Sequence, residues 1–223
     1  MTLANTGEQH GIGQYRFPRS YFLTGKSYGL TAADGARIRL EFLDRERVRI
    51  DGELSFFDCV PAAEDVYFVS LLVAARFIVL DLKRGHAVVV DDTLAFFAID
   101  GLRDAGDIAA GLTDEMTGTS VRWHLGAERY LDQQYVSDKE SRLAWSPRPD
   151  KARSCRTAFA ALGDGLFLIE ADNHAVPGLD VPQGLARLVM VQDFHRVLVT
   201  GCAYSSVFND RILFSGYGEF AGR

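Results

Sequence analysis

The sequence predicts an all-β protein: an antiparallel β-barrel built from two sequence-similar halves, joined by a short helix or loop crossover. Apolar and polar residues alternate with period two along most of the chain, and these runs are rich in β-branched and aromatic residues. The same order of strands and turns also recurs in both halves. We expect residues 1–22 to form an N-terminal tail and first segment, and residues 23–223 to form a single barrel domain. Within that domain the expected parts are a first half at 23–103, a crossover at 104–120 and a second half at 121–220.

The composition limits the class of protein and its partners. The chain has 223 residues, of which 48% are hydrophobic and 24% are charged, and such a chain can bury a core without disulfides or a structural metal. The net charge of −6 argues against a nucleic-acid partner, and no apolar run reaches the roughly 18 residues of a membrane span. The three cysteines form no C-x-x-C pair, and residues 1–14 lack an apolar signal segment. We therefore expect reduced thiols, a cytoplasmic location and no membrane partner.

The first half shows a series of short strands. Residues 36–43 alternate clearly, with Ile38, Leu40 and Phe42 on one face, and a turn at Asp44 leads to a second strand at 47–51. Further strands are expected at 65–72, 76–82, 86–90 and 94–99. The segment 100–118 contains several glycines, which disfavour a long helix, so a short helix or a loop is expected there.

After Ser120 the second half shows the same pattern of short strands. Strands are expected at 121–125, 130–136, 140–145, 156–162, 166–171, 187–192, 196–203 and 211–217. Pro147 and Pro149 exclude a central strand between the third and fourth of these, and loops are expected at 173–184 and 205–210.

An internal repeat connects the two halves. Residues 65–70 resemble 165–170, and residues 75–80 resemble 186–191. In both halves an acidic residue and a turn containing arginine follow, at Asp81 to Arg84 and at Asp193 to Arg196. Two such meanders with one crossover could close one barrel, which would leave no exposed strand edge.

The repeated strands resemble those of a known family. The stretch Asp65-Val66-Tyr67-Phe68-Val69-Ser70, followed by Ile78 to Leu82, is similar to the repeated strand pair of the MoaF family, and Asp164 to Glu170 with His174 to Pro177 is similar in the second half. The resemblance extends from Leu23 to Ser206. It implies a lipocalin-like (calycin) barrel, which also resembles that of phenolic acid decarboxylases, enzymes that need no cofactor. Fold likeness alone does not assign a reaction.

One candidate catalytic set is Glu170, Asp172 and His174. Their i, i+2, i+4 spacing places them on one face of an extended segment. If that face points into the barrel, burial would raise the carboxyl pKa and suit proton transfer near neutral pH. Alternatively, Asp172 to His174 simply begins a solvent-exposed loop. A metal is not expected, because a catalytic metal site made of histidine and carboxylate ligands needs more histidines than this set provides.

A candidate ligand-binding set lies on neighbouring strands. Trp123 and His124 point to opposite faces, so only one of them can face a cavity, and Tyr130 and Tyr135 likewise differ in parity. Arg129 could bind a carboxylate with its guanidinium fork. Alternatively, these residues form ordinary cross-strand pairs on the outer surface. The complete predicted ligand-binding set is His124, Arg129, Tyr130, Trp123 and Tyr67.

These residues predict a pocket for one small molecule. As an enzyme, the protein would be a cofactor-independent lyase or isomerase acting on a small aromatic or carboxylate metabolite, with Glu170 and His174 moving protons while Arg129 and Tyr130 orient the substrate. The alternatives are a non-catalytic carrier or sensor, and a structural module whose barrel is filled by side chains. A homodimer is left open.

Overall fold

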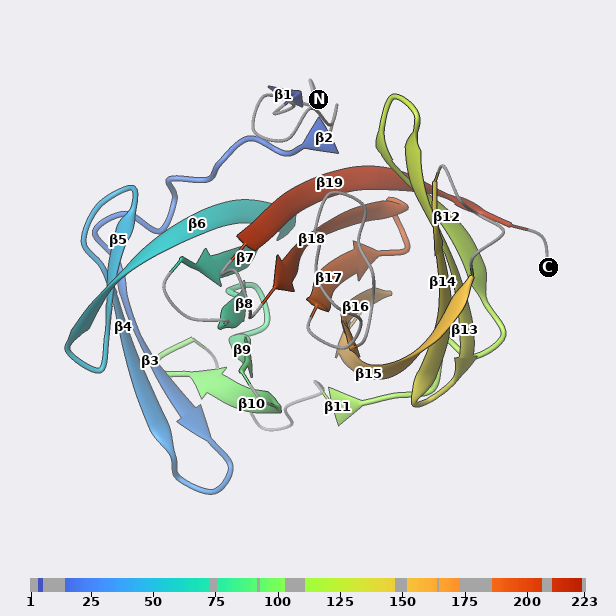
Figure 1. Ribbon diagram of the computed structural model, residues 1–223. Helices are drawn as coiled ribbons and strands as arrows, with labels where there is room; N and C mark the ends of the chain where they lie inside the picture. The colour runs from blue at the N-terminus through green and yellow to red at the C-terminus, as the bar shows by residue number, and fades with distance from the viewer. Residues whose placement is uncertain are drawn as a thin grey trace. The chain divides into compact units, whose positions relative to one another are not determined.

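The computed structural model describes residues 4–5, 15–72, 76–91, 93–102, 111–146, 152–163, 165–172, 186–205 and 210–221. Among these residues the regular elements are β-strands (Figure 1). The chain divides into two compact units, Arg19–Gly111 and the combination of Met1–Pro18 with Leu112–Arg223, and each is described by itself. The described residues include no helix that is long and apolar enough to cross a membrane.

The unit Arg19–Gly111 is a closed barrel in which each strand runs antiparallel to the next. The pairing of β10 with β3 closes the ring, with Ile99 opposite Leu30. We call it the first barrel (Figure 1). Its strands are β3 (Ser27–Ala32), β4 (Arg37–Phe42), β5 (Arg47–Ile50), β6 (Glu53–Ala63), β7 (Val66–Leu71), β8 (Phe77–Asp81), β9 (His86–Val90) and β10 (Leu94–Ile99).

The other unit contains a second antiparallel ring, the second barrel. The pairing of β12 with β19 and that of β15 with β16 complete the ring, while β11 (Gly111–Leu112) adds to β15. The short strands β1 (Ala4–Asn5) and β2 (Tyr15–Arg16) pair with each other, and β2 contacts β12 and β19. The ring strands are β12 (Ser120–Gly126), β13 (Arg129–Ser137), β14 (Glu140–Trp145), β15 (Arg153–Gly163), β16 (Leu166–Asp172), β17 (Ala186–Asp193), β18 (Leu198–Ser205) and β19 (Asp210–Phe220).

The all-β class, the antiparallel barrel and the two similar halves are confirmed. The expectation that both halves share one barrel needs correction, because each half closes a barrel of its own. The sequence patterns missed two strands of the first half, β3 and β6. Gly29 weakens the strand signal in β3, and Pro61 weakens it in β6. With these strands included, a meander of eight can close alone and leave no edge. Of the expected crossover at 104–120, residues 104–110 lie outside the described residues.

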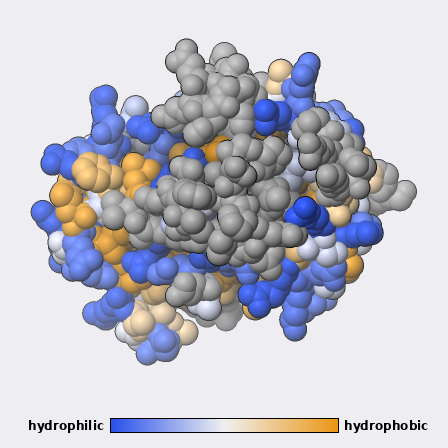
Figure 2. Space-filling view, in the orientation of Figure 1, coloured by the Kyte–Doolittle hydropathy of each residue, from blue (hydrophilic) through white to orange (hydrophobic). Residues whose placement is uncertain are grey.

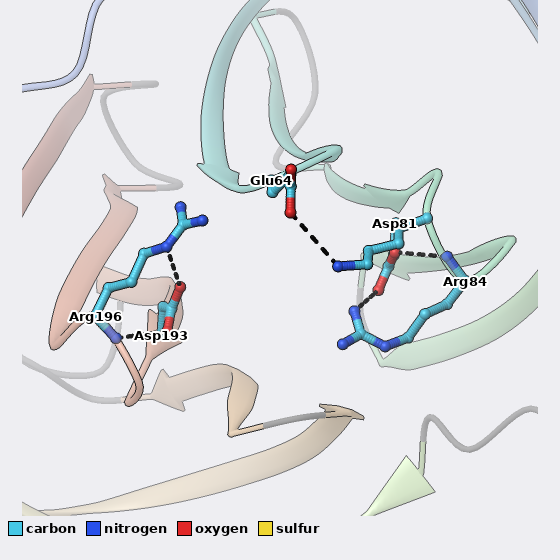
Figure 3. A network of polar contacts seen from close by, with 6 residues as sticks. Glu64, Asp81, Arg84, Asp193 and Arg196 are labelled. Carbon is cyan, nitrogen blue, oxygen red and sulfur yellow. Dashed lines mark hydrogen bonds and ion pairs between the residues drawn. The ribbon is translucent and has the colours of Figure 1, made fainter.

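The predicted acidic turn is present in both barrels (Figure 3). In the first barrel, Asp81 accepts a hydrogen bond from the backbone N–H of Arg84 at 2.9 Å and pairs with its guanidinium at 2.7 Å. In the second barrel, Asp193 accepts from the N–H of Arg196 at 3.0 Å and pairs with its guanidinium at 3.8 Å. The two turns therefore mark equivalent positions in the strand order of the two barrels.

A second marker of equivalence lies where each barrel begins. The N–H of Gly25 donates to the carbonyl of Phe42 at 2.7 Å, and the N–H of Gly118 donates to that of Tyr135 at 2.8 Å. A third is the β-bulge that ends β6 and β15, at Ala63 and at Gly163. With these markers, each inward-facing position of one barrel can be compared with its counterpart in the other.

Apolar side chains from alternate positions along the strands form a buried cluster inside each barrel. One buried cluster belongs to the first barrel and includes Leu40, Val69 and Leu80, and another belongs to the second and includes Leu131, Ile169 and Met190. Figure 2 also shows apolar side chains at the surface, on the side where β4 and β5 lie. The exposed large apolar residues of that unit are Tyr21, Phe22, Leu43, Leu54 and Phe56. Single exposed apolar residues are common on protein surfaces, so they do not by themselves mark a site.

We predict unequal costs for alanine at two glycines of the first barrel that share a left-handed backbone. A Cβ at Gly85 (φ +74°) would lie 2.3 Å from the carbonyl oxygen of Leu102, whereas a Cβ at Gly35 (φ +87°) would meet nothing within 4 Å. Gly35→Ala should destabilise by about 1–2 kcal/mol from backbone strain alone. Gly85→Ala should cost roughly 2 kcal/mol more, because a backbone carbonyl must also move. Urea unfolding followed by circular dichroism measures both, and equal costs would show that the turn adapts.

Candidate ligand-binding site

The interior of the second barrel contains a buried group of polar side chains. Trp123 projects inward from β12, Gln133 and Tyr135 from β13, and Gln192 from β17. All four are at most 1% exposed. Buried polar groups of this kind need hydrogen-bond partners inside the barrel, since water does not reach them.

Hydrogen bonds join these four residues into a unit that we call the crossbar. The Tyr135 hydroxyl donates to Oε1 of Gln192, Nε2 of Gln192 donates to Oε1 of Gln133 at 2.7 Å, and Nε1 of Trp123 donates to the same oxygen at 3.2 Å. Because β13 and β17 lie on opposite sides of the ring, the bond between Gln133 and Gln192 spans the lumen. The crossbar therefore ties two opposite walls together.

An aromatic side chain covers the crossbar from one end of the barrel. Phe194, in the turn between β17 and β18, packs edge-on against Trp123, Tyr135 and Phe167, with ring centroids 5.8, 6.3 and 5.7 Å apart. The barrel is thus plugged by Phe194 at the end where this turn lies.

Several buried polar atoms near this interior lack a partner. Among the described residues, Nε2 of Gln133, Oγ of Ser141 and Oγ of Ser205 are buried without a hydrogen bond. Ser141 lies opposite Tyr135 in the register of β13 and β14, and its parity on β14 is that of the inward-facing Leu143. An unpaired buried polar group costs about 1–3 kcal/mol, so these atoms are suited to a bound polar molecule.

The first barrel has no such crossbar. At the equivalent inward positions its side chains are apolar, and they belong to its hydrophobic cluster. The equivalent residues are Phe42 for Tyr135, Leu40 for Gln133 and Leu80 for Gln192. The polar interior is therefore a property of these side chains and not of the barrel frame.

The second barrel also has smaller side chains at one inward pair. Phe57 lies opposite Leu71 across β6 and β7, whereas Thr157 lies opposite Ala171 across the equivalent strands β15 and β16. At this pair the second barrel therefore has smaller inward side chains than the first.

The polar groups inside the first barrel are neutral at ordinary pH. Burial, with a smaller contribution from the Asp58 carboxylate, raises the pKa of Cys59 to about 12. Burial is also the main cause that raises the pKa of Tyr67 and of Tyr28. Tyr67, which the sequence placed in the ligand-binding set, thus lies in the other barrel from the crossbar, with Phe22 stacked on its ring at 5.2 Å.

Two of the predicted acid–base residues, Glu170 and Asp172, lie on the outer face of β16. Their neighbours Phe167, Ile169 and Ala171 face the interior, so the opposite parity points outward. Glu170 pairs with Arg187, and Asp172 pairs with Arg156 at 2.9 Å. Burial raises the pKa of Glu170, and the Arg187 charge opposes that rise. His174 lies outside the described residues, and a catalytic role for the set stays a prediction.

Trp123 and His124 divide between the two faces of β12, as their parity requires. Trp123 enters the crossbar, whereas His124 stacks on Tyr217 at 4.8 Å and approaches Glu219 at 3.5 Å on the outer face. The inward member of the pair is therefore the tryptophan.

The remaining predicted ligand-binding residues lie away from the crossbar. Tyr130 is on the outer face, where the Arg122 guanidinium covers its ring at 4.3 Å and pairs with Asp132 at 2.6 Å. Arg122 and Asp132 also line an open depression of about 460 Å³. Arg129 begins β13 and is partly exposed.

Two residues of the crossbar were not singled out from the sequence. Gln133 stands between Leu131 and Tyr135, and Gln192 follows Leu188 and Met190, all with the same parity. A glutamine at an inward position of an otherwise apolar series is the signal that could have identified both.

The fold and its interior define a protein of two antiparallel β-barrels, one of which has a polar crossbar. Residues 7–95 match the model of the MoaF family described as the MoaF N-terminal domain, which confirms the resemblance over that part of the chain. A solved structure from Burkholderia vietnamiensis, described as a "putative beta-lactamase", is similar to 48% of this chain and to 96% of its own length, with 12% identity and a TM-score of 0.39. No curated protein matches this chain in sequence.

We predict that the crossbar stabilises the second barrel cooperatively. Tyr135→Phe should destabilise by about 1–3 kcal/mol, because Oε1 of Gln192 loses its donor. Adding Gln192→Leu should cost clearly less than the two single changes summed, because it removes the unpaired amide and recreates the Phe–Leu combination of the first barrel. Urea unfolding of both single variants and of the double variant measures the coupling. Strict additivity would contradict an energetically linked crossbar.

Proposed function

We propose that this protein is a MoaF-like, lipocalin-like (calycin) protein that binds one small molecule inside its second barrel, beside the crossbar. The observation that carries the proposal is the presence of two buried polar atoms without a partner, Nε2 of Gln133 and Oγ of Ser141, which lies opposite Tyr135. Small barrels of about eight strands can hold one small ligand, and such a ligand would supply the missing partners.

The chemistry of the interior favours a carrier or sensor over an enzyme. Burial raises the pKa of Tyr135 well above its usual value and that of Cys155 to about 11, so neither group exchanges protons near neutral pH. No cofactor is needed for binding of this kind. A reducing, cytoplasmic location belongs to the same proposal, since Cys59, Cys155 and Cys202 are buried thiols.

An acid–base enzyme is the second candidate, and one observation favours it. Burial raises the pKa of Glu170 despite its arginine partner, and perturbed carboxyl groups are common at catalytic sites. In that reading the protein would be a cofactor-independent lyase or isomerase, and Glu170 with His174 would move the protons.

We expect ligands to report through tryptophan fluorescence. The chain has two tryptophans, Trp123 and Trp145, and both pack in the interior cluster of the second barrel. A thermal-shift screen of aromatic acids, short-chain acids, amines and neutral aromatic compounds should yield a hit that also changes this fluorescence. At about 100 times its dissociation constant, such a ligand adds roughly 2.7 kcal/mol of stability.

The matched variants for this binding test are Gln192→Leu and Leu80→Met, at equivalent positions of the two barrels. Gln192→Leu should abolish the fluorescence response, because it breaks the crossbar. Leu80→Met should retain it, because it conserves volume in the other barrel. A screen without any hit, or a hit that survives Gln192→Leu unchanged, would contradict a ligand site at the crossbar.

A separate prediction tests catalysis. If the protein transforms its ligand by acid–base chemistry, Glu170→Gln should abolish turnover of an identified ligand and leave its affinity within a few fold, because the amide keeps the shape but cannot exchange the proton. Product formation by chromatography and affinity by fluorescence measure the two effects. Absence of any product with the unmodified protein supports the carrier.

A further inference from the structure

The crossbar atom that lacks a hydrogen-bond partner among the described residues is a donor, Nε2 of Gln133. Oε1 of Gln133 already accepts from Gln192 and Trp123, and Oε1 of Gln192 accepts from Tyr135. The Nε2 group of Gln133 has two hydrogens and, among the described residues, no acceptor. A ligand that completes the crossbar must therefore bring an acceptor atom.

The surroundings of the crossbar disfavour a charged ligand. The rings packed against its Trp123 and Tyr135 are uncharged, namely those of Phe159 and Phe194, and Phe167 packs on Phe194. Glu170 and Arg187, the nearby charges on β16 and β17, pair with each other on the outer face. Because no charged side chain is among these contacts, burying a carboxylate or an ammonium group there is far more costly than burying a neutral polar group.

An alcohol also fits less well than a carbonyl. Its hydroxyl hydrogen needs an acceptor, and the oxygen of the same Gln133 amide already accepts two hydrogen bonds. A carbonyl oxygen brings two lone pairs and no hydrogen. It can accept from Nε2 of Gln133 and, at the same wall, from a hydroxyl such as that of Ser141.

We infer that the second barrel binds an uncharged carbonyl compound with a mostly apolar, aromatic-sized body, whose oxygen accepts a hydrogen bond from Nε2 of Gln133. The inference rests on the proposed binding function and replaces the carboxylate metabolite expected from Arg129. The first barrel takes no such ligand, because Leu40 stands where the second has Gln133. One molecule binds per chain.

The test uses probes that share a body and differ in one group. They are 2-acetylnaphthalene, 2-ethylnaphthalene, 2-naphthoate and 2-naphthylmethylamine, together with the corresponding phenyl compounds as a smaller series. Tryptophan fluorescence titration gives each dissociation constant. We expect the ketone to bind at least about tenfold more tightly than the ethyl compound, because without the carbonyl the amide stays unpaired, and the charged probes to bind weakest.

Variants of one strand then assign the preference to one atom. Gln133→Leu removes the free donor and should abolish the preference for the ketone over the ethyl compound. Gln133→Glu should do the same by replacing the donor with an acceptor. Gln134→Glu is the matched control, since Gln134 is the next residue on β13 and is exposed on the outer face, and it should change nothing.

The outcomes separate this inference from the proposed function. Tightest binding by the naphthoate or the amine, or a ketone preference that persists in Gln133→Leu, would overturn the ligand class and leave small-molecule binding in place. No binding by any probe of either size would overturn both the ligand class and the aromatic-sized pocket. A ketone preference lost in Gln133→Leu and kept in Gln134→Glu supports the assignment.

Discussion

The constraint on which the rest of this structure depends is the closure of each antiparallel meander onto its own first strand. β10 pairs with β3 in one barrel, and β19 pairs with β12 in the other. Closure satisfies the backbone groups that an open edge would expose. It also divides the side chains of every strand into an inward set and an outward set. Each inward side chain must then pack or find a polar partner within a small closed space.

The two barrels meet that requirement in different ways. In the first, Leu40, Phe42 and Leu80 supply apolar packing. In the second, Gln133 and Gln192 take two of these places and must satisfy each other across the lumen. A partly satisfied polar network is less stable than an apolar core, so its remaining donor is most simply explained by a missing partner. This contrast within one chain is the main support for the proposal that a ligand binds in the second barrel.

Much of the local structure could be predicted from the sequence. Period-two alternation identifies most strands. The acidic turns at Asp81 and Asp193 are recognisable as a repeat from the sequence, and the hydrogen bonds of both turns agree with it. The opposite faces of Trp123 and His124 follow from parity alone. Strand β6 was missed, because Pro61 is a signal against a strand and a β-bulge accommodates it there. Which face of β16 points inward was also not determined, and Glu170 lies on the outward one.

The sequence by itself determined which segments form strands, which residues share a face and where the chain turns, because these depend on neighbours a few positions apart. Only the tertiary structure decided that each half closes separately, because closure is a pairing between strands far apart in the chain. It also decided that Gln133 and Gln192 meet, since that contact requires two opposite walls of a completed ring. Alternation in the sequence shows which residues share a face of a strand. Which of the two faces points inward depends on how the whole barrel closes.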